Sequence, residues 1–528
     1  RHNSQLLQSS WYRLIGNQMH DILPGTATPK AYTYAYNDAV LAANGFRTVL
    51  MEAAANIAAR MELPEHREDD TILLLFNPDS TEHHDIVTAE ITGVTYSSRL
   101  RAFTDTNEAL PIQILDQKGE KALVLTAVSM EPLSWRVIRI SELPNGDSAP
   151  LMHQASARMV ETGVLLENRL LRVHIGKGGD IESIYRKGDD DGPGREFLLS
   201  PAGYELQRER PNVFPAWNMD WKDRKKAGRK IASDQTTVFI IEQGPLRATA
   251  RIEVPFGKHG KSRIIRTVSL GTFGTEELVQ ITEHISWHER GCSLKAAFPL
   301  RVTSDRVIGS WETSTTGYGV NTPKQYEFPT RRWLDQSDKS GGHGLSLLVP
   351  YTYGFDHPDE TSLRLTLLFT PGRSPLTVAF RDQMSQDWGE HQIAYALYPH
   401  RGDAAEAETD LRAGQLDHPV RVFRLTAGEL ATRPAQPVTE RVSLLELSSR
   451  QLALLSCKPC EQDPDSFIVR IRENLGRPME HASIAFGSRI LAAEAVNGLE
   501  QRIGSVDWYG KTATFSRSEE HTSELQSR

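Results

Sequence analysis

Residues 262–302 carry the sequence SRIIRTVSLGTFGTEELVQITEHISWHERGCSLKAAFPLRV. It contains three short runs that are rich in apolar and β-branched residues, at positions 262–270, 279–287 and 294–302. Segments that contain glycine separate the runs. Runs of this length between turn residues are typical of β-strands. The stretch therefore predicts three consecutive strands of a β-domain.

The same rhythm of short apolar runs and turn residues extends over residues 155–432, with few windows of helical periodicity. Other predicted strands in this range lie at 236–242, 246–254, 344–349, 363–368 and 391–398. So many strands in one region usually form two large packed sheets. We expect a large β-sandwich domain here.

Two smaller β-domains are predicted on either side of the large one. Residues 64–150 show short strands between Pro, Gly, Asn and Asp, which is typical of a small β-sandwich. A linker at Pro434–Val438 precedes a terminal β-sandwich at 438–515. The final segment, 516–528, includes RSEEHTSELQSR, which resembles a translated sequencing adapter. We expect it to be a non-native, unstructured tail.

Residues 1–63 differ from the rest, because their apolar residues recur at three- and four-residue steps. Thr28 followed by Pro29 is a helix start signal, with a hydroxyl cap before proline at the first helical position. Asn44-Gly45 is a candidate break or kink in this second helix. The predicted fold class is mainly β, with a short N-terminal segment of two helices joined by a tight loop.

Composition narrows the function classes. A chain of 528 residues is long enough for several domains. Its net charge is -8, and its sequence lacks the basic stripe that nucleic-acid binding needs. Its apolar runs are too short to cross a bilayer. Three cysteines are too few for a disulfide framework. We expect neither nucleic acid nor membrane as a partner.

The sharpest chemical feature is the pair His20-Asp21, at a helix end just before a Pro-Gly turn. A neutral imidazole is a good metal ligand, and a carboxylate binds metal or accepts hydrogen bonds from sugar hydroxyls. Catalytic zinc needs three protein ligands, so the pair is not a complete site. The alternative is that both residues only cap the helix end.

Residues 17–32, NQMHDILPGTATPKAY, resemble the histidine motif of the class II α-mannosidases, glycoside hydrolase family 38. Further similarities follow in family order along the chain, to about residue 505. They include Phe76-Asn77-Pro78, Leu166-Glu167-Asn168, Ala216-Trp217-Asn218-Met219-Asp220, and Gly389-Glu390-His391 through to His400. The ordered set is more specific than any single motif, and it implies that 1–63 closes a three-helix bundle beside a catalytic α/β barrel.

The resemblance implies roles for individual residues. His20 would bind one Zn²⁺, shared with the barrel domain missing from this chain, and another divalent metal such as Co²⁺ is compatible with the same ligands. Asp21 would bind hydroxyls of the mannose. The nucleophile and the acid/base carboxylate of a retaining mechanism would lie upstream of residue 1. Trp217 and Asp220 are weaker candidates for sugar binding.

Other readings stay open. Asp387, Trp388, Glu390 and His391 are candidates to reach the cleft, but they also fit a polar strand entry with Trp388 in the core. The chain as a whole would be an inactive fragment of an α-mannosidase that hydrolyses terminal α-linked mannose of oligosaccharides or glycans. The alternatives are a non-catalytic carbohydrate-binding or scaffolding array, and a family relative that acts on mannosylglycerate. The resemblance implies a cytoplasmic location and leaves homo-oligomerisation open.

Overall fold

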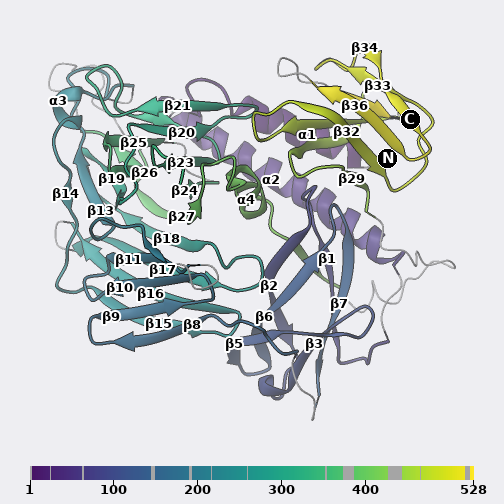
Figure 1. Cartoon of the computed structure of the whole chain (residues 1–528), viewed down its shortest axis with the longest axis horizontal. Helices are drawn as coiled ribbons and strands as arrows, with labels where there is room; N and C mark the ends of the chain where they lie inside the picture. Colours follow the sequence, from purple (N-terminus) through teal and green to yellow (C-terminus); the bar gives the residue numbers. More distant parts are fainter. Residues whose placement is uncertain are drawn as a thin grey trace.

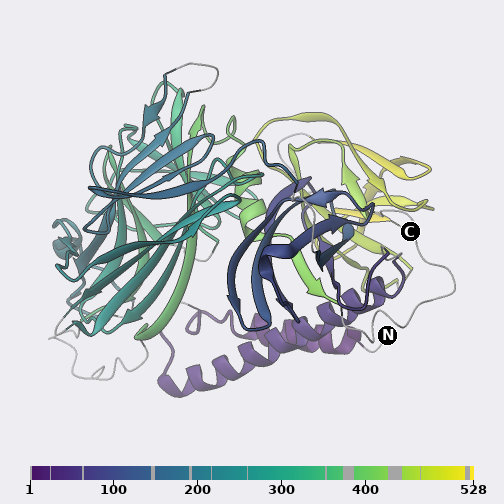
Figure 2. The ribbon, with the colours of Figure 1, turned by 90° about the horizontal axis from the view of Figure 1, so that it is seen from below.

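The computed structural model describes residues 3–23, 25–61, 65–143, 149–188, 193–215, 217–257, 260–350, 354–372, 386–425, 443–463, 465–517 and 524–527. Three β-domains follow a pair of helices, so the prediction of a mainly β fold is confirmed. In Figures 1 and 2 the helix pair runs along one side of the β-domains.

The helix pair consists of α1 (Asn3–Gly16) and α2 (Pro29–Ala58). Thr28 caps α2 by accepting a hydrogen bond from the Ala31 amide, as the Thr-Pro signal predicts. The predicted break at Gly45 is wrong, because α2 runs unbroken through it. A Cβ at Gly45 would lie 2.0 Å from the Ser10 hydroxyl, so the glycine allows α1 to approach closely.

The small β-domain has two sheets. One has the strand order β28-β1-β7-β3-β4 and the other β2-β6-β5. Their bounds are β1 Thr71–Phe76, β2 His83–Thr92, β3 Leu100–Thr104, β4 Ala109–Leu110, β5 Ile112–Lys118, β6 Lys121–Met130, β7 Trp135–Glu142 and β28 Arg421–Arg424, with a 3₁₀ turn at Ser97–Arg99. Ala54 and Ala58 of α2 pack against the first sheet, in a cluster with Leu74 and Phe423.

β28 corrects a predicted boundary. The sequence predicts that residues 155–432 form the large domain, but β28 pairs with β1 of the small domain. The chain thus returns to the small domain after the large one. The edge of β1 has backbone N–H and C=O groups that any extended segment can pair with. The sequence of a strand as short as the four-residue β28 therefore does not predict which sheet it joins.

The large β-domain contains sheets of nine, six and five strands. The nine-stranded order is β15-β16-β17-β18-β27-β24-β23-β20-β21, and the others are β14-β13-β19-β26-β25-β22 and β12-β11-β10-β9-β8. The first two predicted strands of 262–302 become the antiparallel pair β17 and β18, and the third becomes β19 in the six-stranded sheet. Apolar residues of the three sheets share one core, which includes the fully buried Trp287 and Phe355.

The strand bounds of this domain are β8 Ser156–Val160, β9 Gly163–Glu167, β10 Leu171–Gly176, β11 Ile181–Arg186, β12 Arg195–Glu196, β13 Gly203–Arg208, β14 Arg229–Lys230, β15 Thr237–Gln243, β16 Arg247–Phe256, β17 Ser262–Gly271, β18 Val279–Trp287, β19 Cys292–Pro299, β20 Arg306–Ser310, β21 Thr315–Gly319, β22 Phe328–Pro329, β23 Trp333–Ser337, β24 His343–Leu348, β25 Gly354–Asp359, β26 Ser362–Thr370 and β27 Gly389–Arg401. Two short helices, α3 (Trp221–Arg224) and α4 (Thr409–Asp417), accompany them.

The terminal domain has the sheets β29-β32-β36-β35 and β30-β31-β37-β33-β34. Their bounds are β29 Leu445–Leu447, β30 Leu452–Pro459, β31 Phe467–Glu473, β32 Met479–Phe486, β33 Ala493–Val496, β34 Arg502–Ser505, β35 Asp507–Tyr509, β36 Thr512–Arg517 and β37 Glu524–Ser527. The predicted linker at Pro434–Val438 lies outside the described residues.

The predicted unstructured tail needs a correction. β36 reaches Arg517, and β37 pairs with β31 and β33, so part of the segment 516–528 is sheet. Backbone pairing between two strand edges does not require a favourable side-chain pattern. Among the described residues, no helix combines the length and the apolar character that a membrane crossing requires.

Candidate functional site

The turn between α1 and α2 carries the predicted site and is fixed by its own backbone. The Asp21 carbonyl accepts hydrogen bonds from the amides of Thr26 at 2.9 Å and Ala27 at 2.8 Å. The Tyr32 hydroxyl, from the first turns of α2, donates to the carbonyls of Asp21 and Ile22, each at 3.2 Å. Figure 2 shows this turn at the end of the helix pair that lies by the large β-domain. Pro24 lies outside the described residues.

The two site side chains lie together but are held differently. His20 Nε2 is 3.4 Å from Asp21 Oδ2, and the side chain of His20 is 79% exposed against 32% for Asp21. Thr26 Oγ1 donates to Asp21 Oδ1 at 3.0 Å, which orients the carboxylate. The turn therefore presents an accessible imidazole beside an oriented carboxylate. That arrangement can bind a metal ion and sugar hydroxyls.

A complete metal site does not form from this chain's described residues. Among them, no group of three or more His, Cys, Asp or Glu side chains is placed to hold an ion. His20 and Asp21 supply at most two ligands, and catalytic zinc takes three from protein. The exposed imidazole fits the role of a single ligand whose partners come from elsewhere.

Trp217 and Asp220 lie on a loop before α3, at an outer edge of the large β-domain. Figures 1 and 2 both show α3 well apart from the start of α2, so the structure does not bring these residues to His20 and Asp21. Trp217 is 63% exposed. Asp220 Oδ2 accepts from the Asn212 amide at 2.9 Å and pairs with Lys222 Nζ at 3.0 Å. The Asp220 carboxylate thus stabilises its own loop.

Below this loop lies a buried charge cluster, which we define as Glu209, Arg224, Lys295, Asp356 and Arg364. Arg224 Nη1 donates to Glu209 Oε1 at 2.6 Å, and Lys295 Nζ lies 3.7 Å from Asp356 Oδ1. Burial lowers the pKa of Lys295 well below 10.5. Burial alone would raise the pKa of Asp356, but the charges of Lys295 and Arg364 lower it to about 2.

We did not predict this cluster from the sequence. One residue in the sequence points to the cluster: Lys295 lies inside the apolar run 294–302. A lysine is rarely fully buried unless it is paired, so a buried Lys295 implies an acidic partner. The cluster fixes the Trp217 loop to the six-stranded sheet through Arg224 and is therefore structural.

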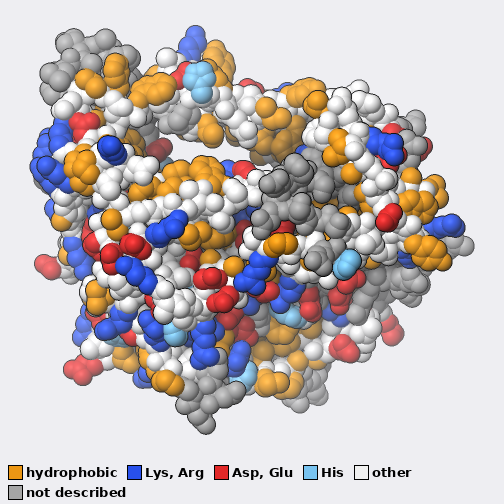
Figure 3. All heavy atoms as spheres, turned by 45° about the horizontal axis from the view of Figure 1, so that its top comes forward, with side chains coloured by type: hydrophobic (Ala, Val, Ile, Leu, Met, Phe, Trp, Pro, Cys, Tyr) orange, Lys and Arg blue, Asp and Glu red, His pale blue; other side chains and the backbone are white. Residues whose placement is uncertain are grey.

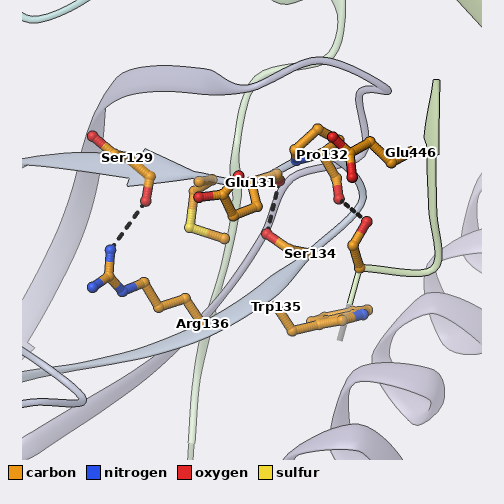
Figure 4. A pocket seen from close by; sticks show the side chains of 9 residues that line it. Ser129, Glu131, Pro132, Ser134, Trp135, Arg136 and Glu446 are labelled. Atoms are coloured by element: carbon orange, nitrogen blue, oxygen red, sulfur yellow. Dashed lines mark hydrogen bonds between the residues drawn. The ribbon is translucent and has the colours of Figure 1, made fainter. Parts of the chain in front are cut away.

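A cavity of about 270 Å³ lies between the small and terminal β-domains, away from the turn. Figure 4 shows its polar lining: Arg136 donates to the Ser129 carbonyl, and Ser134 donates to the Glu131 carbonyl. Ser443 donates across the domain boundary to the Pro132 carbonyl at 2.7 Å. The first two hydrogen bonds lie within the small β-domain, and the Ser443 bond joins it to the terminal domain.

Comparison with known proteins identifies the large β-domain. Residues 166–374 match the family model described as "Glycosyl hydrolases family 38 C-terminal domain". The match covers less than half of the chain and places its large β-domain with the C-terminal domains of the family 38 glycosyl hydrolases. The family resemblance inferred from the motifs is thus confirmed.

Two proteins named as alpha-mannosidases are similar to most of this chain. Alpha-mannosidase 2C1 of Homo sapiens is 25% identical over 505 residues, which cover 92% of this chain and 42% of that protein. Alpha-mannosidase G of Dictyostelium discoideum is 21% identical over 499 residues, with 89% and 43% covered. The chain thus spans less than half the length of these curated relatives.

A solved structure shares the fold. The crystal structure of an alpha-mannosidase from Enterococcus faecalis V583 superposes with a TM-score of 0.76 at 13% identity, covering 99% of this chain and 63% of that one. At this identity the likeness concerns the fold. The family 38 match makes the large β-domain similar to a domain of glycosidases, and it leaves the metal and the roles of His20 and Asp21 as predictions.

Proposed function

We propose that this chain is part of a zinc-dependent retaining α-mannosidase that hydrolyses terminal α-linked mannose from oligosaccharides or glycans. The observation that carries the proposal is the His20-Asp21 pair on a fixed turn, in a chain that corresponds to the C-terminal portion of a family 38 enzyme. In this proposal His20 is one metal ligand and Asp21 binds the terminal mannose. The other ligands, the nucleophile and the acid/base come from the N-terminal catalytic domain of the whole enzyme.

The geometry of the turn supports a division of labour between the two residues. The imidazole of His20 is open to solvent, so its lone pair is accessible to an ion. Asp21 is oriented by Thr26, and a carboxylate fixed in this way accepts hydrogen bonds from ring hydroxyls with little loss of entropy. A bound divalent ion would hold hydroxyls of the sugar ring and help to orient it.

The helix pair also carries a surface that fits the missing catalytic domain. Large apolar side chains are exposed along it: Trp11, Tyr12, Ile15, Met19, Leu23, Tyr34 and Tyr36. Figure 3 shows a deep hollow in the upper half of one face of the molecule, with hydrophobic side chains along its edges. Contiguous exposed apolar surface marks an interaction site. We therefore propose that the catalytic domain covers this surface and that the chain alone is inactive.

The test uses this chain joined to its N-terminal catalytic domain. We expect His20→Ala to lose bound zinc, measured by mass spectrometry of the purified protein, and to lose hydrolysis of an aryl α-mannoside. Asp21→Asn should keep the zinc and lower kcat/KM. His153→Ala is a matched control, because His153 is exposed on another segment.

Two outcomes would sink the proposal. Unchanged zinc content in His20→Ala would show that His20 is not a metal ligand. A wild-type protein that binds sugar but does not hydrolyse it would favour the non-catalytic carbohydrate-binding array. Steady α-mannosidase turnover by residues 1–515 alone would contradict the expected inactivity.

A further inference from the structure

A cavity of about 350 Å³ lies between the large and terminal β-domains. One face of the nine-stranded sheet forms part of its lining, because Trp333 and Asp335 lie two positions apart on β23 and Ile308 of β20 pairs with Asp335. Other lining residues come from the segment 403–405 before α4 and from the loop 474–476 after β31. In Figures 1 and 2 α4 lies between the sheets of the large β-domain and the terminal domain. Two domains therefore build this cavity together.

Two polar side chains of the lining are held at one atom and free at another. Asn474 Oδ1 accepts a hydrogen bond from Arg472 Nε at 3.0 Å. Asp403 Oδ1 accepts from the amides of Ala405 and Glu406, both at 2.9 Å. In the described part of the chain, no hydrogen bond or ion pair uses the amide nitrogen of Asn474 or Oδ2 of Asp403. The terminal domain thus offers a fixed donor, and the large domain offers a fixed acceptor.

Arg306 of β20 adds a cation to the lining. Its guanidinium lies against Gly317 of the paired strand β21, where a Cβ would come within 2.3 Å of Nη2. The glycine therefore leaves room for the arginine to lie across its neighbouring strand. No described residue forms a hydrogen bond or an ion pair with this guanidinium, so its N–H groups are available to a ligand.

Two buried aspartates complete the polar lining and already have partners. Asp410 accepts from Trp333 Nε1 at 2.9 Å and from Arg332 Nη2 at 3.0 Å. Asp335 accepts from Ser346 Oγ at 2.7 Å. The exposed fraction is 2% for Asp335 and 7% for Asp410, so packing and hydrogen bonds fix both side chains. A wall that is rigid before the ligand arrives lowers the entropy cost of binding.

The lining favours a neutral ligand that is rich in hydroxyl groups. A small anion would meet the Arg306 guanidinium but also three carboxylates, which repel it. A metal ion is disfavoured, since the described residues contain no group of three His, Cys, Asp or Glu side chains placed to hold one. A sugar hydroxyl both donates and accepts, so one sugar ring can bond the two donors and the acceptor together. The volume is within the range of about 300–1,000 Å³ for small-molecule sites.

We propose that this cavity is a second sugar-binding site, separate from the His20-Asp21 turn, which takes a neutral monosaccharide or the end unit of a glycan. Arg306 and Asp403 bind the sugar from the large β-domain, and Asn474 binds it from the terminal domain. A bound sugar therefore bridges the two domains. The inference goes beyond the proposed function and does not depend on it, because its three residues lie outside the turn.

The experiment uses the full-length protein with His20→Ala and Asp21→Asn, so that the proposed catalytic site no longer contributes to sugar binding. Calorimetric titration with D-mannose, and separately with D-glucose, measures binding at the cavity, and we expect at least one of the two sugars to bind. Arg306→Ala should raise its Kd about tenfold or more, because a charged donor is lost. Asn474→Asp should raise the Kd about fivefold, because it removes the free donor but keeps the acceptor for Arg472.

Arg158→Ala is the matched control, since Arg158 is an exposed arginine of β8 in the same domain and does not line the cavity. Its Kd should equal that of the parent. In enzyme that keeps His20 and Asp21, Arg306→Ala should hydrolyse an aryl α-mannoside as well as wild type does. A protein that binds sugar in this titration but never hydrolyses a mannoside would contradict the proposed function alone.

Three results would overturn the second site. Neither sugar binds the His20→Ala, Asp21→Asn protein, or both cavity variants bind the sugar as tightly as their parent. Inorganic phosphate, titrated as a probe, binds more tightly than either sugar and loses its affinity in Arg306→Ala, which would make the cavity an anion site. Hydrolysis that falls in Arg306→Ala as much as sugar binding does would show that the cavity is not separate from the catalytic site.

Discussion

Arg266 of β17 and Glu283 of β18 form an ion pair, with Nε 3.2 Å from Oε1, inside the apolar core of the large β-domain. Tyr395 donates to the same carboxylate at 2.9 Å, and Tyr204 donates to its other oxygen. The Tyr204 ring also lies 4.0 Å from the Arg266 guanidinium carbon. Both charged groups are thus compensated where water is excluded, which makes the pair vulnerable to loss of one partner.

Glu283→Gln should destabilise the protein by about 3–5 kcal/mol, because it leaves the Arg266 charge buried without a counter-charge. Calorimetric unfolding would measure the effect. Arg263→Gln is the matched control: Arg263 also lies on β17 and pairs with Glu253 of the neighbouring strand β16, but it is exposed. We expect the control to cost less than about 1 kcal/mol. Equal losses in the two variants would contradict the argument.

Gly45→Ala should destabilise the helix pair, although alanine favours helix by about 1 kcal/mol over glycine. The new Cβ would lie 2.0 Å from Ser10 Oγ and 3.3 Å from Ser10 Cβ, so the Ser10 hydroxyl must leave its hydrogen bond to the Leu6 carbonyl or the helices must separate, at a cost of about 1–3 kcal/mol. Thermal unfolding followed by circular dichroism would show it. Gly16→Ala, where nothing lies within 4 Å, should be neutral or stabilising. Ser10→Ala combined with Gly45→Ala should recover part of the loss; a failure to recover would argue against the clash.

Stability should fall with acid through Asp356. Its pKa is lowered from 3.8 to about 2 in the folded protein, so its contribution is present above pH 4 and is lost as pH falls from 4 towards 2. At about 1.4 kcal/mol per pKa unit, the loss is roughly 2 kcal/mol. Denaturant unfolding between pH 5 and 2.5 measures it. Asp356→Asn should be less stable at pH 5 and show a shallower acid slope, whereas Asp234→Asn should keep the wild-type slope.

Thr26→Val should weaken substrate binding without loss of metal. The variant keeps the side-chain shape but removes the hydroxyl that donates to Asp21 Oδ1. A net hydrogen bond contributes about 1 kcal/mol, so KM of the full-length enzyme should rise about fivefold. Thr33→Val is the comparison, because Thr33 Oγ1 bonds the Pro29 carbonyl of its own helix. A KM that does not move would remove Thr26 from the proposed site.

Some features follow from the sequence because they depend on neighbours in the chain. The runs of 262–302 predict strands through their alternating apolar residues, and Thr28-Pro29 predicts the start of α2 through a local cap. The pairing of His20 with Asp21 is also local, since the two residues are adjacent. The family order of motifs added the resemblance to the family 38 glycosidases.

Only the tertiary structure decided the partners of these elements. β28 pairs with β1, although more than 340 positions separate them in the sequence. Gly45 of α2 leaves room for Ser10 of α1, and Lys295 of β19 pairs with Asp356 of β25. Strand partners and buried charge pairs are set by packing between distant segments, and a short run of sequence encodes its own conformation but not the surface that it meets.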